Sequence, residues 1–211
     1  FVTTDAAIEQ KLLQQALKRA GELSFNRISV DGDTSTNDCL FVLANGKAGN
    51  QKIVTTGADY QAFETALTFV CTGLAKMIAR DGEGATKFVE IKVTGADSEV
   101  DAVRAGKAIA TSNLVKTAIF GEDANWGRIL AAVGYSGIEF DPSGADIYLG
   151  DLLVCKGGIG LVFDESKAKR ILAQKDLLIT VTLSPETKCE ASVWTCDLSY
   201  DYIKINGSYR T

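Results

Sequence analysis

Glu83 stands between two glycines at the end of a long amphipathic segment. Because neither neighbour is bulky, its carboxylate is open to a ligand and could pair with an ammonium group. A glycine stop followed by a solvated acid is also a common way for a helix to end. Local features therefore leave two interpretations of Glu83 open, a binding residue and a helix terminus.

A second group of polar side chains fills residues 31–38, with three aspartates, two threonines, a serine and an asparagine. Such side chains commonly bond their own backbone in turns. Loops at strand ends also form active-site walls, which is the functional interpretation. A carboxylate metal site is disfavoured, because the regular ligand spacing of hard-cation loops is missing.

A third polar loop precedes the helix expected at residues 126–133. Asn125 is a suitable N-cap for that helix and Trp126 a suitable packing anchor. Arg128 is expected to pair with Glu122 or with an adjacent aspartate and so to hold the loop. The structural interpretation is favoured for Asn125 and Trp126.

The carboxyl-terminal segment, residues 200–211, alternates aromatic and aliphatic side chains. Chain ends usually fray, but this pattern predicts a strand or a docked tail, and a docked tail can line a site. Asn206-Gly207-Ser208 also matches the glycosylation pattern, which the cysteine usage argues against.

A mixed α/β framework is expected to position these residues. Periodicity predicts helices at 8–20, ending at Gly21, and at 59–78, 98–110, 126–133 and 165–172. Strands are predicted at 25–30, 40–44, 88–93, 114–120, 147–154, 177–183 and 191–198. No linker or repeat divides the chain, so we expect one structural unit, 1–211, with a possible C-terminal subdomain from about residue 135.

The composition excludes several classes of function. The 22 basic residues are outnumbered by 27 acidic ones, and this net charge of −5 argues against a surface for nucleic acid or anionic membrane. The chain has no histidine, which excludes Ser-His-Asp and Cys-His arrangements and histidine-ligated metals. Any catalysis must use other groups.

Cysteine usage and the chain start bear on the compartment. The five cysteines are scattered without a C-x-x-C pair, which favours reduced thiols and a cytoplasmic location. No stretch approaches about 18 consecutive apolar residues, so no membrane span is expected. A first residue Phe1, rather than Met, is expected of a processed chain.

Five motifs together resemble one family, the ornithine acetyltransferases, which includes bifunctional glutamate N-acetyltransferases. They follow the family's order along the whole chain, at residues 1–7, 25–38, 82–87, 121–129 and 196–203. Ala124 stands where many relatives have proline. The chain is similar to the β chain that such precursors release when they cut themselves between Ala and Thr.

The resemblance implies an activity and a partner. The family transfers the acetyl group of N-acetyl-ornithine to glutamate in arginine biosynthesis, through a ping-pong cycle and an acetyl-threonine, and bifunctional members also accept acetyl-CoA. It implies an N-terminal-nucleophile αββα-like architecture completed by an α chain from the same precursor, in an α2β2 or larger assembly. No other cofactor and no metal is implied, and the oxyanion donors belong to the α chain.

The resemblance also assigns residues. Glu83, Asn206 and Thr211 correspond to substrate-binding positions of the family, Glu83 through a substrate amine. No catalytic residue lies in this chain, because the nucleophilic threonine of the family lies just upstream of Phe1. Thr3 and Thr4 lie behind that position and are expected to begin the first helix.

Two other functions stay open. An amidohydrolase or aminopeptidase with the same N-terminal-nucleophile plan would let water accept the acyl group. A non-catalytic assembly subunit is the second alternative, because the nucleophile is missing from the chain.

Overall fold

The computed structural model describes residues 1–208, which form two compact units. The first unit comprises Phe1–Asn26 and Thr34–Met77, and the second comprises Arg27–Asp33 and the chain from Ile78 onward. Residue 135, where a subdomain was expected to begin, lies inside the second unit. The organisation of the chain as one structural unit stays a prediction.

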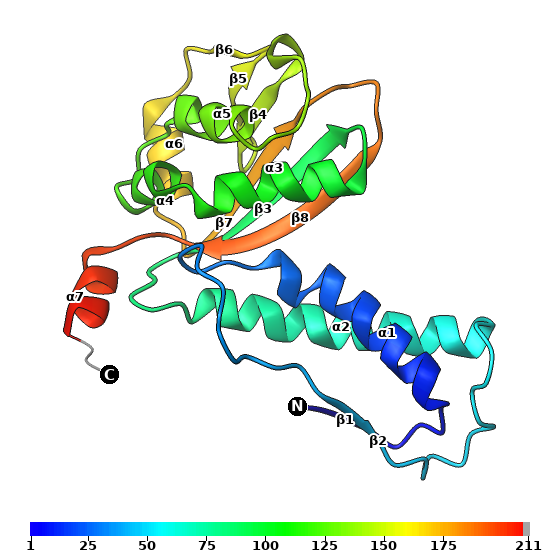
Figure 1. The fold of residues 1–211 in the computed structure, drawn as a ribbon. Coiled ribbons are helices and arrows are strands. Elements are labelled where there is room, and N and C mark those ends of the chain that lie inside the picture. Colours follow the sequence, from blue (N-terminus) through cyan, green and yellow to red (C-terminus); the bar gives the residue numbers. More distant parts are fainter. Residues whose placement is uncertain (209–211) are drawn as a thin grey trace. The chain divides into compact units, whose positions relative to one another are not determined.

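Figure 1 shows helices and strands in both units. The helices are α1 (Gln10–Leu23), α2 (Ala58–Arg80), α3 (Glu99–Thr111), α4 (Asn113–Phe120), α5 (Trp126–Gly134), α6 (Glu165–Leu172) and α7 (Tyr200–Ser208), with single 3₁₀ turns at Phe25–Arg27 and Pro142–Gly144. The strands are β1 (Val2–Thr4), β2 (Val42–Ala44), β3 (Phe88–Ala96), β4 (Asp146–Leu149), β5 (Leu152–Lys156), β6 (Ile159–Gly160), β7 (Asp176–Thr182) and β8 (Cys189–Cys196).

The first unit is built on α1 and the part of α2 that belongs to it. Small and apolar side chains at helical spacing form its core, namely Leu12, Ala16, Ala20, Tyr60, Leu67 and Cys71, with Ile53 beside them. Strands β1 and β2 pair in parallel, Val2 opposite Val42. This unit therefore has a two-helix core and a two-stranded sheet.

Two predictions about the start of the chain were wrong. Thr3 and Thr4 lie in β1 and do not begin a helix, because α1 starts only at Gln10. The helix also continues through Gly21 to Leu23, since a glycine inside a helix costs only about 1 kcal/mol.

The second unit is built on a six-stranded mixed sheet in the order β6-β5-β4-β7-β3-β8. β3 pairs in parallel with β7 and antiparallel with β8. Three rows of residues cross these strands on one face and are buried, Leu177-Val89-Thr195, Ile179-Ile91-Val193 and Val181-Val93-Ala191. The intervening rows include Lys92 and Glu190, which form an ion pair of 3.0 Å. This alternation gives the sheet one main core face, and on the other face Phe88 and Trp194 belong to a small separate cluster.

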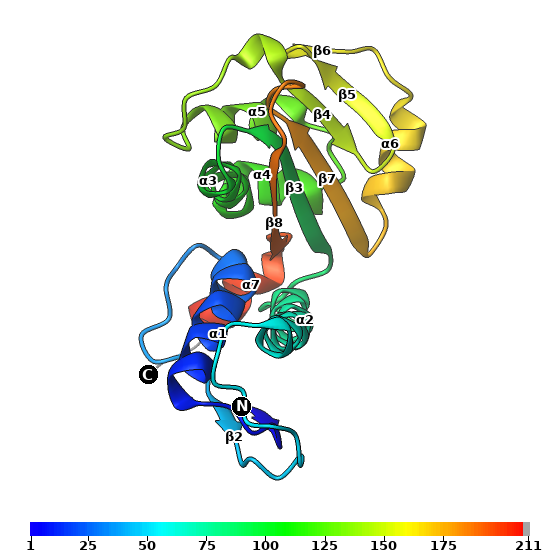
Figure 2. The same cartoon turned by 90° about the vertical axis from the view of Figure 1, so that its right-hand side faces the viewer.

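Helix α3 packs on β3 and β8, and α5 packs on α3 (Figure 2). Ser98 caps α3 by accepting a hydrogen bond from the backbone N–H of Asp101 at 3.1 Å. The expected α/β class, with helices layered on mixed sheet, is confirmed.

Three predicted strands differ from the structure. Residues 114–120 form α4, in which Val115, Ala118 and Ile119 are buried at helical spacing. Residues 25–30 form a 3₁₀ turn followed by a single bridge from Ile28 to Trp194. Residues 147–154 form the hairpin β4–β5 rather than one strand. Short apolar runs do not distinguish helix from strand by periodicity alone, which explains the first error.

We expect Gly95→Ala to destabilise the protein far more than Gly137→Ala. Both glycines have positive φ, +71° and +80°, so alanine costs about 1–2 kcal/mol at either position. A Cβ at Gly95 would also overlap the backbone carbonyl of Ser184, whereas nothing lies within 4 Å at Gly137. The overlap adds roughly 1–3 kcal/mol. Urea denaturation measures both, and equal losses would contradict this account.

Candidate functional site

The candidate site is built around the Glu83 loop, residues 81–87, which connects α2 to β3. Both flanking glycines are required by packing. A Cβ at Gly82 would lie 2.9 Å from Cys196 Sγ, and Gly84, with φ +67°, would bring one within 2.5 Å of the Tyr202 nitrogen. The glycines thus let the loop approach the end of β8 and the start of α7.

Asp197 fixes the same loop from the end of β8. The residue as a whole is 2% exposed. Oδ1 accepts hydrogen bonds from the backbone N–H groups of Thr86 (2.8 Å) and Lys87 (2.9 Å), and Oδ2 accepts one from the Thr86 hydroxyl (2.5 Å). The hydroxyl of Ser199 donates to the carbonyl of Gly84 at 2.5 Å. Sequence reasoning missed Asp197 and Ser199, although both lie in one of the five motifs.

Helix α7 brings a predicted site residue to the loop. Asn206 Nδ2 donates to Glu83 Oε2 at 3.0 Å, so two residues 123 positions apart in the sequence meet. One helical turn earlier, the Tyr202 hydroxyl donates to Asp31 Oδ2 at 2.9 Å. Residues four apart share a helix face, so one face of α7 holds both carboxylates. Of the two structures predicted for residues 200–211, the strand is wrong for Tyr200–Ser208, which form a helix, and the contacts of this helix agree with a docked tail.

Several carboxylates surround the Tyr202 phenol. Its hydrogen bond to Asp31 is the main cause that raises the pKa of Tyr202 to about 12, with burial and the charges of Asp31, Asp33 and Glu83 adding to it. Three carboxylates therefore act on this phenol, and a carboxylate is the partner that a ligand with an ammonium group needs.

Two buried lysines tie neighbouring elements to this end. Lys87 Nζ donates to the carbonyl of Ile119, at the end of α4, at 3.0 Å and lies 3.5 Å from Glu122 Oε1. Lys116 Nζ donates to the carbonyl of Cys196 and to Thr195 Oγ1 (3.1 Å). Burial lowers the pKa of Lys116, and the neighbouring Cys196 and Asp197 oppose this shift.

The polar segment 31–38 is explained mainly by local turns. Asp31 accepts from the backbone N–H of Asp33, and the Ser35 hydroxyl accepts from that of Asp38. The Tyr202 contact of Asp31 is the exception. The turn interpretation is thus confirmed for these residues.

The third polar loop largely behaves as predicted. Asn125 caps α5 by accepting from the backbone N–H of Arg128 at 3.2 Å, and Trp126 packs against the core. The predicted pairing of Arg128 with the acids was wrong, because its guanidinium donates to the carbonyl of Leu114 at 2.8 Å. Thr211, the third predicted substrate contact, lies outside the described residues.

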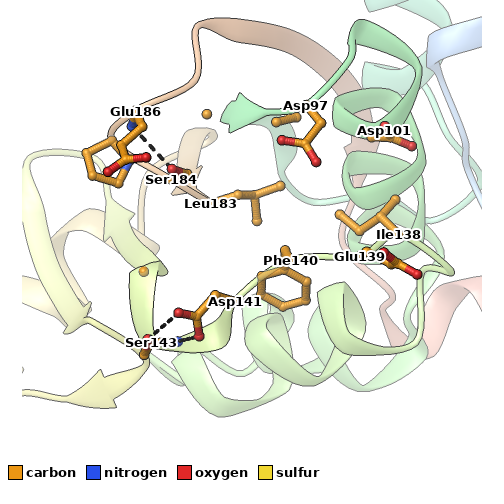
Figure 3. Close-up of a pocket in the computed structure, with 14 residues that line it drawn as sticks. Asp97, Asp101, Ile138, Glu139, Phe140, Asp141, Ser143, Leu183, Ser184 and Glu186 are labelled. Carbon is orange, nitrogen blue, oxygen red and sulfur yellow. Dashed lines mark hydrogen bonds between the residues drawn. The ribbon is translucent and has the colours of Figure 1, made fainter.

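A hollow of about 410 Å³ lies at the end of β3 that is far from the Glu83 loop (Figure 3). Its lining includes the carboxylates of Asp97, Asp101, Glu139, Asp141 and Glu186. Two of them serve local structure, since Asp101 accepts from the Ser98 hydroxyl and Asp141 from the Ser143 hydroxyl, both at 2.6 Å. No predicted site residue lies there, so the Glu83 loop is the better candidate.

Within residues 1–208, no group of three His, Cys, Asp or Glu side chains is arranged to hold a metal ion, and all five cysteines are free.

Comparison with known proteins identifies the family. The sequence matches the ArgJ family over residues 1–211, and the chain belongs to that family. It is 56% identical to the arginine biosynthesis bifunctional protein ArgJ of Symbiobacterium thermophilum and 54% identical to that of Caldanaerobacter subterraneus, in each case over the whole chain. The chain spans about half the length of these relatives, 52% and 53%.

A solved structure gives the same answer for the fold. The arginine biosynthesis bifunctional protein of Bacillus halodurans is 46% identical, with a TM-score of 0.95 over 99% of this chain and 98% of that one. The resemblance carried by the five motifs is thereby confirmed.

We expect Tyr202→Phe to lower the free energy of unfolding at pH 7 by about 1 kcal/mol, through loss of the bond to Asp31. Because the folded-state pKa of Tyr202 is raised from 10.0 to about 12, this stabilisation is complete below pH 10 and is lost as pH rises toward 12. The difference between the two proteins should therefore shrink above pH 10. Urea denaturation at several pH values measures it, and a difference that grows with pH would contradict the sign.

Proposed function

We propose that this chain is the β chain of a self-cleaved acetyltransferase of arginine biosynthesis, which moves the acetyl group of N-acetyl-ornithine to glutamate. The contact between Glu83 and Asn206 carries the proposal, because it joins two residues that the family resemblance assigns to substrate. We also propose that this enzyme acts in the cytoplasm, as the cysteine usage predicts.

Glu83 supplies the group that an amino-acid substrate needs. Asn206 occupies Oε2 of its carboxylate, and a substrate amine can approach the other oxygen. A charge-assisted hydrogen bond of this kind is about twice as strong as a neutral one. Asn206 thereby orients Glu83 while α7 remains docked.

The chemistry follows the N-terminal-nucleophile plan. The threonine that precedes Phe1 in family precursors would attack the acetyl carbonyl, with its own amine as base. The amide C–N bond of N-acetyl-ornithine would then break, and ornithine would leave as the amine after taking up the proton of the threonine hydroxyl. The amine of glutamate would then attack the acetyl ester and release the threonine hydroxyl. In bifunctional members acetyl-CoA would serve as a second acyl donor, and the scheme requires no resident cofactor.

The companion α chain is the partner we propose, and the first unit presents a surface for it. On α2, four apolar side chains are exposed along one face, Phe69 (80%), Val70 (44%), Leu74 (36%) and Met77 (65%), around a shallow hollow. The β1–β2 pair is parallel, and parallel sheets are normally covered on both faces. The chain spans about half the length of its relatives, and the half of those relatives that it does not match is the occupant we propose.

A bilayer is the competing occupant of this face. α2 is the one helix among the described residues that is long and apolar enough to cross a membrane, and 22% of its apolar window is buried. Leu67, Cys71 and Ala75 form a buried stripe next to this exposed face, which favours a helix packed between protein layers.

We expect Glu83→Gln in the assembled enzyme to raise KM for glutamate by about tenfold or more, because a neutral amide replaces a carboxylate that faces an ammonium group. Glutamine keeps an acceptor for Asn206, so the loop should stay in place. Steady-state transfer of acetyl from N-acetyl-ornithine to labelled glutamate measures the change.

Glu186→Gln is the matched control, because it neutralises a carboxylate in the hollow at the far end of β3. It should leave KM unchanged. A raised KM for Glu186→Gln together with an unchanged KM for Glu83→Gln would place the substrate site in that hollow instead. Release of free acetate without acetyl-glutamate would indicate a hydrolase, and no turnover by the intact complex would indicate an assembly subunit.

We expect the double substitution Phe69→Asp with Met77→Asp to weaken association with the α chain by about tenfold or more, because charge would enter an apolar contact. Co-purification of the two chains from the cleaved precursor measures this. Val162→Asp, at an exposed apolar residue of the second unit, is the control and should leave association intact. Unchanged association, or flotation of the wild-type chain with liposomes through this face, would contradict the assignment.

A further inference from the structure

We infer that Asp197 is a positioning residue for substrate, which acts by holding the Glu83 loop in its binding conformation. The inference rests on the proposed function of Glu83 and adds a second residue to it. Asp197 itself is buried and makes its contacts within the protein.

The end of the β3–β8 ladder places Asp197 against the loop. Phe88 and Cys196 form the last pair of the two antiparallel strands. The next residues on either side are Lys87 and Asp197, whose backbones remain joined by the Asp197 N–H to Lys87 carbonyl bond of 3.2 Å. The carboxylate thus lies beside the segment that leads back to Glu83.

The loop needs such an anchor because of its glycines. Gly82 and Gly84 flank Glu83, and glycine loses more backbone freedom on ordering than any other residue. A carboxylate carried by this segment would be poorly aimed without external bonds. Asp197 supplies three acceptor contacts at Thr86 and Lys87, within four residues of Glu83.

The anchor is itself held rigidly. Lys116 Nζ donates to the carbonyl of Cys196, directly before Asp197, and the Leu198 N–H approaches the Lys116 carbonyl at 3.4 Å. Ser199 then reaches Gly84 from the same segment. Residues 196–199 therefore connect α4 to the Glu83 loop without any contact that requires substrate.

The geometry predicts how Asp197 influences catalysis. Loss of its acceptors should free the loop and raise KM for the amino-acid substrate, since part of the binding energy would be consumed in ordering Glu83. The acetyl-transfer step involves the threonine and the α chain, so kcat should change less. Asn at this position keeps Oδ1 for both backbone N–H groups and should restore most of the affinity.

A double-mutant cycle in the assembled enzyme tests the inference. We expect Asp197→Ala to raise KM for glutamate about tenfold, with kcat within about threefold of wild type, and Asp197→Asn to recover most of the loss. In a Glu83→Gln background, Asp197→Ala should raise KM by less than about twofold, because its effect passes through the Glu83 carboxylate.

Asp146→Ala is the matched control. Oδ1 of Asp146 accepts the Gly157 N–H at 2.8 Å at the opposite end of the same sheet, so this variant also loses a carboxylate-to-backbone bond. It should lower thermal stability and leave KM unchanged. If Asp197→Ala does not assemble, Ser199→Ala replaces it with the same expected rise in KM.

The outcomes separate the two claims. If Glu83→Gln changes KM but Asp197→Ala does not, or if the two effects multiply independently, the positioning role is overturned and the function of Glu83 stands. If Glu83→Gln itself leaves KM unchanged, the assignment of Glu83 fails and the inference fails with it. If Asp197→Ala and the control Asp146→Ala raise KM equally, the positioning role of Asp197 is also overturned.

Discussion

A carboxylate removed from water is unfavourable by several kcal/mol unless hydrogen bonds replace its hydration. Asp197 meets that requirement with the backbone just before β3, and this constraint organises the whole end of the second unit. Because the donors belong to the Glu83 loop, satisfying the buried charge also fixes the loop. Stability and site geometry therefore depend on the same three bonds.

The docked helix α7 adds a second, more exposed layer to this arrangement. Tyr202 and Asn206 are one turn apart and bond Asp31 and Glu83 from the same face. Their donors leave each carboxylate with free acceptor capacity, so it can still accept a further donor while it is held in place. A site of this kind suits a small ligand with an ammonium group, which is the class of substrate we propose.

The two units differ in how complete they are. The second has a six-stranded sheet with a continuous buried core, whereas the first has a two-stranded parallel sheet and an exposed apolar face on α2. A two-stranded sheet is marginal by itself, and an exposed apolar face of this kind is typical of an interaction surface. The proposed companion chain would provide what the first unit lacks, and the relatives are long enough to contain it.

Sequence alone determined the features with strong local signals. The helix at α2, the cap of α5 and the strands β3, β7 and β8 were predicted, and Glu83 was assigned to substrate binding through its motif, an assignment that stays a prediction. Tertiary structure decided the rest. The run 114–120 became a helix because its buried side faces a core formed by distant segments, and Asp197 gained its role from donors 110 and 111 positions away. Periodicity reports which residues prefer burial, but only the folded chain decides which buried charge meets which backbone donor.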